Sequence, residues 1–226
     1  MEESTLIPIS TSVQLEARIY NPSVSLPHSP VPKGLAIVAH PYDSLGGCFD
    51  DHVVCVGRST GRASWTGASE SEDYQHVLSW SMRDFEARHS SVRGASVVLC
   101  GYSAGSLYCS TAQVKASSPT WASQPPLYVL ISYPCGVLWA LSLFQSARYE
   151  RALSQLLAGK EAKVLVVYGT KDDFTGRKTY ESWIEGMGSS ELRVEVIEDG
   201  DHFWRTRASL QQLVDCVDAW VSSESD

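Results

Sequence analysis

The sequence predicts an α/β protein in which a mostly parallel central sheet carries helices on both faces. Short apolar runs rich in Val, Leu and Ile, typical of buried strands, recur at 34–40, 96–101, 127–133 and 163–168. Segments with apolar residues at helical spacing separate or follow these runs, as at 70–89 and from about 206 onward. Because strands and helices alternate, the strands are expected to run parallel, with the crossover helices covering the sheet.

Three segments of the N-terminal part predict distinct elements. Residues 13–20 alternate apolar and polar side chains, which predicts a half-buried edge strand. Residues 21–33 hold four prolines and are expected to form a surface loop. Residues 34–40 are almost continuously apolar and predict a central parallel strand, which leads into a loop that ends in Gly46 and Gly47.

The rest of the chain continues the alternation of helices and strands. Helices are expected at 70–89, from the end of the second apolar run to about 115, at 149–157, at 179–187 and from about 206. Strands are expected at 96–101, 127–133, 163–168 and 192–197. The chain has no internal repeat and no interdomain linker, so residues 1–226 are expected to form a single domain.

Composition narrows the class of function. The chain is 43% hydrophobic and 19% charged, as in ordinary globular proteins, and its net charge is −8. This negative charge argues against a nucleic acid or an anionic membrane surface as the main partner, because like charges repel. The six cysteines show no C-x-x-C pair or zinc spacing, and the N-terminus lacks a signal-peptide pattern. Reduced thiols and a cytoplasmic location are therefore expected.

One stretch is apolar enough to be compared with a membrane span. Residues 116–147 carry no charge, but Ser132, Pro134 and Gly136 interrupt the stretch in its middle. Its flanks are polar and show no basic bias. We expect a buried strand followed by a segment that lines a pocket, and no membrane span.

A nucleophile motif follows the strand expected at 96–101. The sequence Gly101-Tyr102-Ser103-Ala104-Gly105 fits the G-x-S-x-G pattern, in which a tight turn between a strand and a helix exposes the serine hydroxyl. Small residues on both sides of the serine let the strand and the helix approach closely. The motif predicts Ser103 as a nucleophile, and an ordinary strand-to-helix turn is the alternative.

Candidate partners for this serine follow later strands. A serine hydroxyl needs a neutral imidazole to accept its proton, and the imidazole needs a carboxylate to orient it. Asp172 follows the strand at 163–168, and His202 follows the last strand, in the order Ser, acid, His. Ligands of parallel sheets bind at the carboxyl ends of the strands, so the three side chains are expected to meet there. Asp173 is a rival acid and Asp201 a weaker one.

Other polar residues favour simpler interpretations. His40 precedes Pro41 at a strand end and is expected to shape the loop rather than to catalyse. Asp50, Asp51 and His52 are adjacent, and adjacent residues on a helix point in different directions, so no metal site is predicted.

Together these motifs resemble the α/β-hydrolase superfamily, in particular its small, lidless, intracellular serine hydrolases. The matching elements run in order along the chain from about 34 to 220: His40-Pro41 with Gly46-Gly47, the motif at 101–105, Gly169-Thr170-Lys171-Asp172, and Asp201-His202-Phe203. The resemblance implies an α/β-hydrolase fold with Ser103 as nucleophile, His202 as base and Asp172 as orienting acid. It further implies an oxyanion hole made by the backbone N–H of Ala104 and one from the loop near Tyr42.

One departure from that family concerns the segment after the glycine pair. Family members place a helix and a further parallel strand there, whereas only residues 48–56 lie between Gly47 and Gly57. A crossover with its return strand needs more than about a dozen residues. The fold is therefore expected to lack one βαβ unit near residues 48–57, which would expose the edges of neighbouring strands.

The function expected from these patterns is hydrolysis of carboxylic esters or thioesters through an acyl-enzyme intermediate. A small-molecule acyl ester or thioester is the expected partner, and no cofactor or metal is expected. Residues 135–144 either line an acyl pocket or pack in the core, and His40, Trp139 and Phe203 are the candidate pocket residues. The alternative is a catalytically inactive hydrolase-like binding or scaffold protein, and a peptidase or amidase is less favoured.

Overall fold

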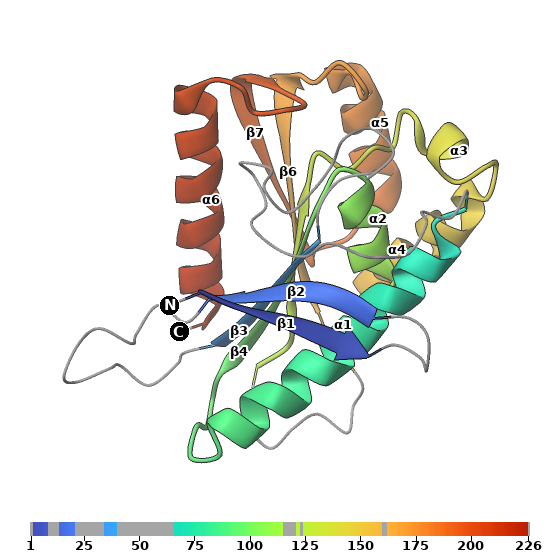
Figure 1. Cartoon of the computed structure of the whole chain (residues 1–226). Helices are drawn as coiled ribbons and strands as arrows, with labels where there is room; N and C mark the ends of the chain where they lie inside the picture. Colours follow the sequence, from blue (N-terminus) through green and yellow to red (C-terminus); the bar gives the residue numbers. More distant parts are fainter. Residues whose placement is uncertain are drawn as a thin grey trace.

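The chain folds around a five-stranded parallel sheet, which an N-terminal two-stranded hairpin precedes (Figure 1). The structure is a computed structural model that describes residues 2–8, 14–20, 34–39, 66–114, 121–122, 124–159 and 162–225. The strands are β3 (Gly34–Ala39), β4 (Ser96–Tyr102), β5 (Leu127–Ile131), β6 (Lys163–Lys171) and β7 (Leu192–Asp201). They lie in this order, and each pairs in parallel with the next. The predicted α/β class with a parallel sheet is confirmed.

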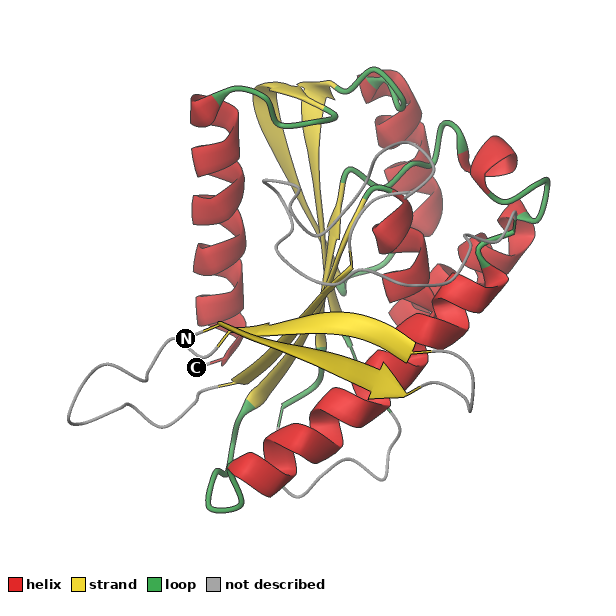
Figure 2. Cartoon of the chain, in the orientation of Figure 1, coloured by secondary structure: helices red, strands yellow, loops and turns green. Residues whose placement is uncertain are grey.

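Helices cover both faces of the sheet, as the alternation of elements predicted. They are α1 (Ala68–Arg88), α2 (Ala104–Thr111), α3 (Leu138–Leu141), α4 (Ser146–Ala158), α5 (Arg177–Met187) and α6 (Arg207–Ser225). Figure 2 shows α6 on one face of the sheet and α1, α2, α4 and α5 on the other.

Two layers of apolar side chains separate the sheet from these helices. In β5, Leu127, Val129 and Ile131 belong to the cluster that includes α6. Tyr128 and Leu130 belong to the larger cluster on the opposite face. All five side chains are buried, because β5 is the middle strand and its successive side chains point to opposite faces.

Helix α1 forms where the apolar spacing predicted a helix. Its buried residues Tyr74, Leu78 and Phe85 lie on one face. The Tyr74 hydroxyl lies 3.2 Å from the carbonyl oxygen of Ile37 and 3.3 Å from that of Cys100, and donates towards them. The helix is therefore tied both by burial and by polar contact to β3 and β4.

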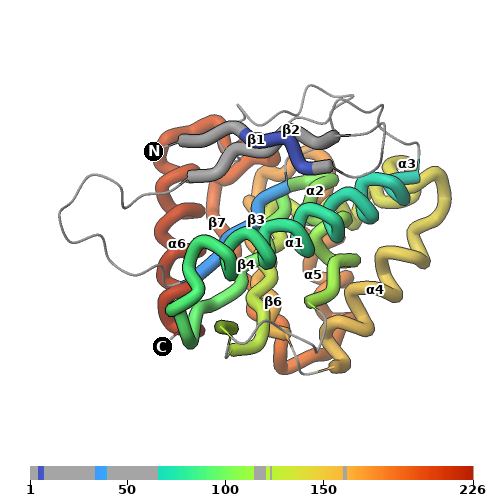
Figure 3. Tube along the Cα trace, turned by 60° about the horizontal axis from the view of Figure 1, so that its bottom comes forward, coloured from blue at the N-terminus to red at the C-terminus, as the bar shows by residue number. Residues whose placement is uncertain are grey.

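The N-terminal hairpin forms a sheet of its own. Strand β2 (Gln14–Tyr20) was predicted, whereas β1 (Glu2–Pro8), its antiparallel partner, was not. Figure 3 shows β1 and β2 side by side. The buried side chain of Ile7 packs against Val77 and Trp80 of α1. The hairpin is thus attached through α1 and pairs with no strand of the described five-stranded sheet.

The predicted central position of residues 34–40 is wrong for the sheet as described. Strand β3 is parallel, but it is outermost in the five-stranded sheet and pairs on one side only, with β4. An apolar run indicates burial of a strand's faces and carries no information about its place in the strand order. The shortened unit at 48–57 lies outside the described residues and stays a prediction.

The apolar stretch at 116–147 contains several elements. Within it lie β5, α3 and the start of α4, and α3 was not predicted as an element. In the part of the chain that the structure describes, no helix combines the length and the apolar character that crossing a bilayer requires.

Candidate active site

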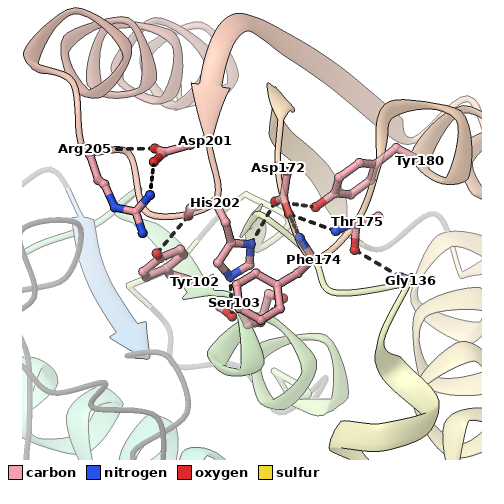
Figure 4. A network of polar contacts seen from close by, with 11 residues as sticks. Tyr102, Ser103, Gly136, Asp172, Phe174, Thr175, Tyr180, Asp201, His202 and Arg205 are labelled. Atoms are coloured by element: carbon pink, nitrogen blue, oxygen red, sulfur yellow. Dashed lines mark hydrogen bonds and ion pairs between the residues drawn. The ribbon is translucent and has the colours of Figure 1, made fainter.

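The candidate active site lies where β4, β6 and β7 end (Figure 4). Ser103 follows the last residue of β4, Asp172 follows that of β6, and His202 follows that of β7. The strands are parallel, so their carboxyl ends share one edge of the sheet. The three residues singled out in the sequence therefore meet at one place.

The turn at Ser103 has the strained backbone that the motif predicted. Its φ of 54° and ψ of −123° lie in a region that residues other than glycine rarely adopt. A Cβ added to Gly101 would lie 2.3 Å from the carbonyl oxygen of Gly105, so this position excludes a side chain. The Ser103 N–H donates to the carbonyl of Ile131 at 2.9 Å, which ties the turn to β5.

Gly101→Ala is expected to destabilise the protein by about 3 kcal/mol, because the added methyl group meets backbone that cannot move aside cheaply. Gly186→Ala is the matched control. That glycine is exposed in α5 with nothing within 4 Å of an added Cβ, so alanine should stabilise the helix by about 0.5 kcal/mol. Urea unfolding of both variants tests the prediction, and an unfolding midpoint for Gly101→Ala equal to that of the wild type contradicts it.

Hydrogen bonds join the three side chains in series. Ser103 Oγ lies 2.9 Å from His202 Nε2, and His202 Nδ1 lies 2.8 Å from Asp172 Oδ2. A neutral imidazole with its proton on Nδ1 satisfies both contacts, since Nδ1–H donates to the carboxylate and Nε2 accepts from the hydroxyl. The exposed fractions are 9% for Ser103, 5% for Asp172 and 3% for His202, so these polar contacts are largely shielded from water.

The pairing of β6 with β7 sets the distance between acid and imidazole. After a register shift, Lys171 lies opposite Asp201, so Asp172 and His202 follow paired residues on neighbouring strands. A Cβ added to Gly169 would lie 2.1 Å from the carbonyl oxygen of Gly200. This close approach of two backbones lets both strands extend to the site.

Asp172, and not Asp173, is the carboxylate that contacts His202. Asp172 Oδ1 accepts the backbone N–H groups of Phe174 and Thr175, both at 2.9 Å. Its Oδ2 contacts His202 and also accepts the Tyr180 hydroxyl at 3.3 Å. Asp173 is exposed. Of the candidate acids, Asp172 is therefore the one whose carboxylate lies beside the imidazole, and Asp201 is paired with Arg205 instead.

His202 is held from several sides. The Tyr102 hydroxyl donates to the His202 carbonyl oxygen at 2.9 Å, and the ring of Phe174 lies 4.4 Å from the imidazole, between centroids. The Phe203 ring lies 5.3 Å from the imidazole in an edge-to-face arrangement, with the Arg205 guanidinium 4.5 Å from its centre. These contacts limit rotation of the imidazole.

Of the other predicted site residues, Ala104 and Phe203 lie next to Ser103 and His202 in the chain. Ala104 opens α2, so its N–H has no acceptor within the helix. Phe203 lies beside His202, whereas Trp139 is 55% exposed and its ring contacts Phe144. The role of Trp139 in a pocket stays a prediction. Several candidates lie outside the described residues: His40, Tyr42, Gly46, Gly47, Asp50, Asp51 and His52.

The cysteines of the described part of the chain are poorly suited to compete with Ser103 as nucleophiles. Cys100, Cys109, Cys135 and Cys216 are free thiols. Burial raises the pKa of Cys100 and that of Cys135 to about 12, which disfavours the nucleophilic thiolate near neutral pH. No group of three or more His, Cys, Asp and Glu residues in that part could hold a metal ion.

Sequence reasoning missed four residues that hold the site in place. Phe174 and Thr175 donate to Asp172 from two and three residues further along, a local pattern that an aspartate in a turn can signal. Tyr102 stands within the nucleophile motif, yet its variable position carries no signal. Tyr180 lies on α5 and comes to Asp172 only through folding.

Comparison with known proteins finds likeness in structure. An α/β serine hydrolase homologue from Coxiella burnetii is 20% identical, with 95% of this chain and 94% of that chain covered and a TM-score of 0.66. An α/β serine hydrolase without a lid from Xanthomonas campestris is 18% identical, with 98% of this chain and 94% of that chain covered and a TM-score of 0.67. An esterase from Pyrococcus furiosus is 13% identical, with 100% of this chain and 92% of that chain covered and a TM-score of 0.66. No protein-family model and no curated protein matches the sequence.

Proposed function

Since the chain has the α/β-hydrolase fold, we propose that it hydrolyses carboxylic esters or thioesters through an acyl-enzyme intermediate. The observation that carries the proposal is the series Ser103–His202–Asp172, in which contacts of 2.9 Å and 2.8 Å join a hydroxyl, an imidazole and a carboxylate. Structural neighbours that are serine hydrolases and esterases support a hydrolase.

In the first step, Ser103 Oγ attacks the carbonyl carbon while His202 Nε2 accepts the hydroxyl proton. Asp172 stabilises the imidazolium that forms and keeps the ring oriented. The imidazolium then gives its proton to the leaving alcohol or thiol as the carbon–oxygen or carbon–sulfur bond breaks. Water attacks the acyl-serine with His202 again as base, which releases the carboxylic acid and restores Ser103.

The negative charge on the attacked carbonyl oxygen needs hydrogen-bond donors. We assign one donor to the Ala104 N–H, which stands at the N-terminus of α2 next to the nucleophile and has no acceptor within the helix. The second donor is the N–H proposed near Tyr42. A donor of this kind contributes about 3 kcal/mol to stabilisation of the transition state.

Aromatic rings beside the imidazole favour a substrate with an apolar group. Phe174, with 36% of its surface exposed, and Phe203 both lie against His202, so an acyl or leaving group at Ser103 would pass close to them. The proposed pocket role of Trp139 extends this apolar surface along residues 135–144. A dependence of rate on acyl chain length is therefore expected.

The proposal is tested by labelling and turnover of the purified chain. A fluorophosphonate is expected to modify a single peptide that contains Ser103, and p-nitrophenyl esters and acyl thioesters of increasing chain length are expected to be hydrolysed. Faster cleavage of an anilide than of the matching ester would favour an amidase instead. A chain that unfolds cooperatively but is neither labelled nor active would establish the alternative, a binding or scaffold protein without turnover.

A further inference from the structure

A buried phenol contacts the acid of the candidate site from behind. Tyr180 lies in the first turn of α5 with no exposed surface, and its hydroxyl lies 3.3 Å from Asp172 Oδ2. The same oxygen accepts the Nδ1–H of His202 at 2.8 Å. Asp172 Oδ2 therefore accepts hydrogen bonds from both the phenol and the imidazole, whereas Oδ1 accepts them from two backbone N–H groups.

The core of the protein determines where this hydroxyl lies. The Tyr180 ring stacks on that of Tyr168 with 3.9 Å between centroids and 16° between planes. Tyr168 belongs to β6, the strand that leads directly into Asp172, so the stack anchors Tyr180 to the strand that positions the acid. Figure 4 shows Tyr180 on the side of Asp172 away from Ser103.

The phenol remains a hydrogen-bond donor over a wide pH range. Burial, reinforced by the negative charge of Asp172, raises the pKa of Tyr180 well above its ordinary value. A neutral phenol can only donate to an ionised carboxylate, because the carboxylate carries no proton to give in return.

We propose that Tyr180 is a positioning residue that acts through Asp172 to set the pH range in which His202 accepts the proton of Ser103. This inference rests on the proposed function, and it assigns a role to a residue outside the series of three. By sharing Oδ2, the phenol disperses part of the negative charge that faces the imidazole. It also limits rotation of the carboxylate about the Cβ–Cγ bond.

The direction of the effect follows from the charge on Oδ2. Without the phenol hydroxyl, more negative charge faces Nδ1–H, which stabilises the imidazolium and keeps the ring protonated to higher pH. Other titratable or charged groups near the acid and the imidazole are the Cys135 thiol, the Tyr102 phenol and the Asp201–Arg205 pair. These groups are unchanged when only the Tyr180 hydroxyl is removed.

Tyr180→Phe with Tyr168→Phe as matched control tests the proposal. Both variants keep the aromatic stack, but only the first removes a hydroxyl that contacts Asp172. In Tyr180→Phe the acidic limb of the kcat/KM profile for a p-nitrophenyl ester is expected to move to higher pH by roughly half a unit, a loss of about threefold on that limb. Tyr168→Phe is expected to leave the limb in place.

A second variant is expected to shift the acidic limb of the kcat/KM profile in the opposite direction. Replacement of Tyr180 by 3-fluorotyrosine keeps the hydroxyl and makes it a stronger donor, so the acidic limb is expected to move to lower pH. Thermal unfolding shows whether each variant is folded, and the fluorinated chain provides the test should Tyr180→Phe fail to fold.

A spectroscopic measurement separates this proposal from the proposed function. In proton NMR spectra, the Nδ1–H resonance of His202 is expected to move downfield in Tyr180→Phe and to stay in place in Tyr168→Phe, whether or not the protein turns over an ester. An inactive wild type with this shift would refute the hydrolase proposal and retain the positioning role. An unchanged resonance and pH profile in Tyr180→Phe, or equal changes in both phenylalanine variants, would overturn the positioning role.

Discussion

Ser103→Ala is expected to abolish labelling by a fluorophosphonate and to lower kcat/KM for p-nitrophenyl esters by at least about 1,000-fold. The Ser103 hydroxyl is the group that lies 2.9 Å from His202 Nε2, and no other described oxygen takes its place in the series. Alanine removes the atom that forms the bond to the acyl group, while the strand and helix around it remain. Steady-state hydrolysis and mass spectrometry of the labelled chain measure the loss.

Ser110→Ala is the matched control for this substitution. Ser110 lies on the same helix α2 and is also buried, and its hydroxyl donates to the carbonyl of Leu107 within the helix. Its removal is expected to leave labelling at the level of the wild type. Labelling that persists in Ser103→Ala at the wild-type rate would refute the assignment of Ser103.

Asp172→Asn is expected to lower kcat by about 10,000-fold, the loss typical when the orienting aspartate of a serine hydrolase becomes an amide. The structure gives the reason. Two backbone N–H groups occupy Oδ1, so the asparagine oxygen must take that position and its NH₂ group must face His202. An NH₂ group cannot accept from Nδ1–H, and the imidazole would then carry its proton on Nε2, where it cannot accept from Ser103.

Asp173→Asn removes the neighbouring carboxylate as a control. Asp173 is exposed, and the contact to His202 comes from Asp172. Hydrolysis is expected to remain within about twofold of the wild type, since exposed charges have weak effects at a distance. A loss in Asp173→Asn that exceeds the loss in Asp172→Asn would contradict the geometry of the site.

The nucleophile turn is the part of the site that the sequence predicts best. Its requirement is local: a strand, a sharp turn and a helix within a few residues, with small side chains where the backbones meet. Both the φ of 54° at Ser103 and the close approach of Gly101 to Gly105 follow from this local arrangement. Short-range sterics of this kind are visible in residue types and spacing alone.

Strand order and hairpin pairing were harder to predict because they depend on contacts between distant segments. The run at 34–40 has the apolar character of a central strand, yet β3 is the outermost strand of the described sheet. Strand β1 pairs in antiparallel with β2, and its buried Ile7 packs on α1. Apolar periodicity reports which faces of a strand are buried, and it does not report which neighbour pairs with each edge.

The sequence by itself determined the alternation of strands and helices, the nucleophile turn, and a short set of candidate site residues in their order along the chain. Tertiary structure alone decided that Asp172 rather than Asp173 meets His202, and that Tyr180 meets Asp172. The physical reason is distance along the chain. Ser103 and His202 are 99 residues apart and Asp172 and His202 are 30 apart, so their contacts exist only after parallel strands align their ends.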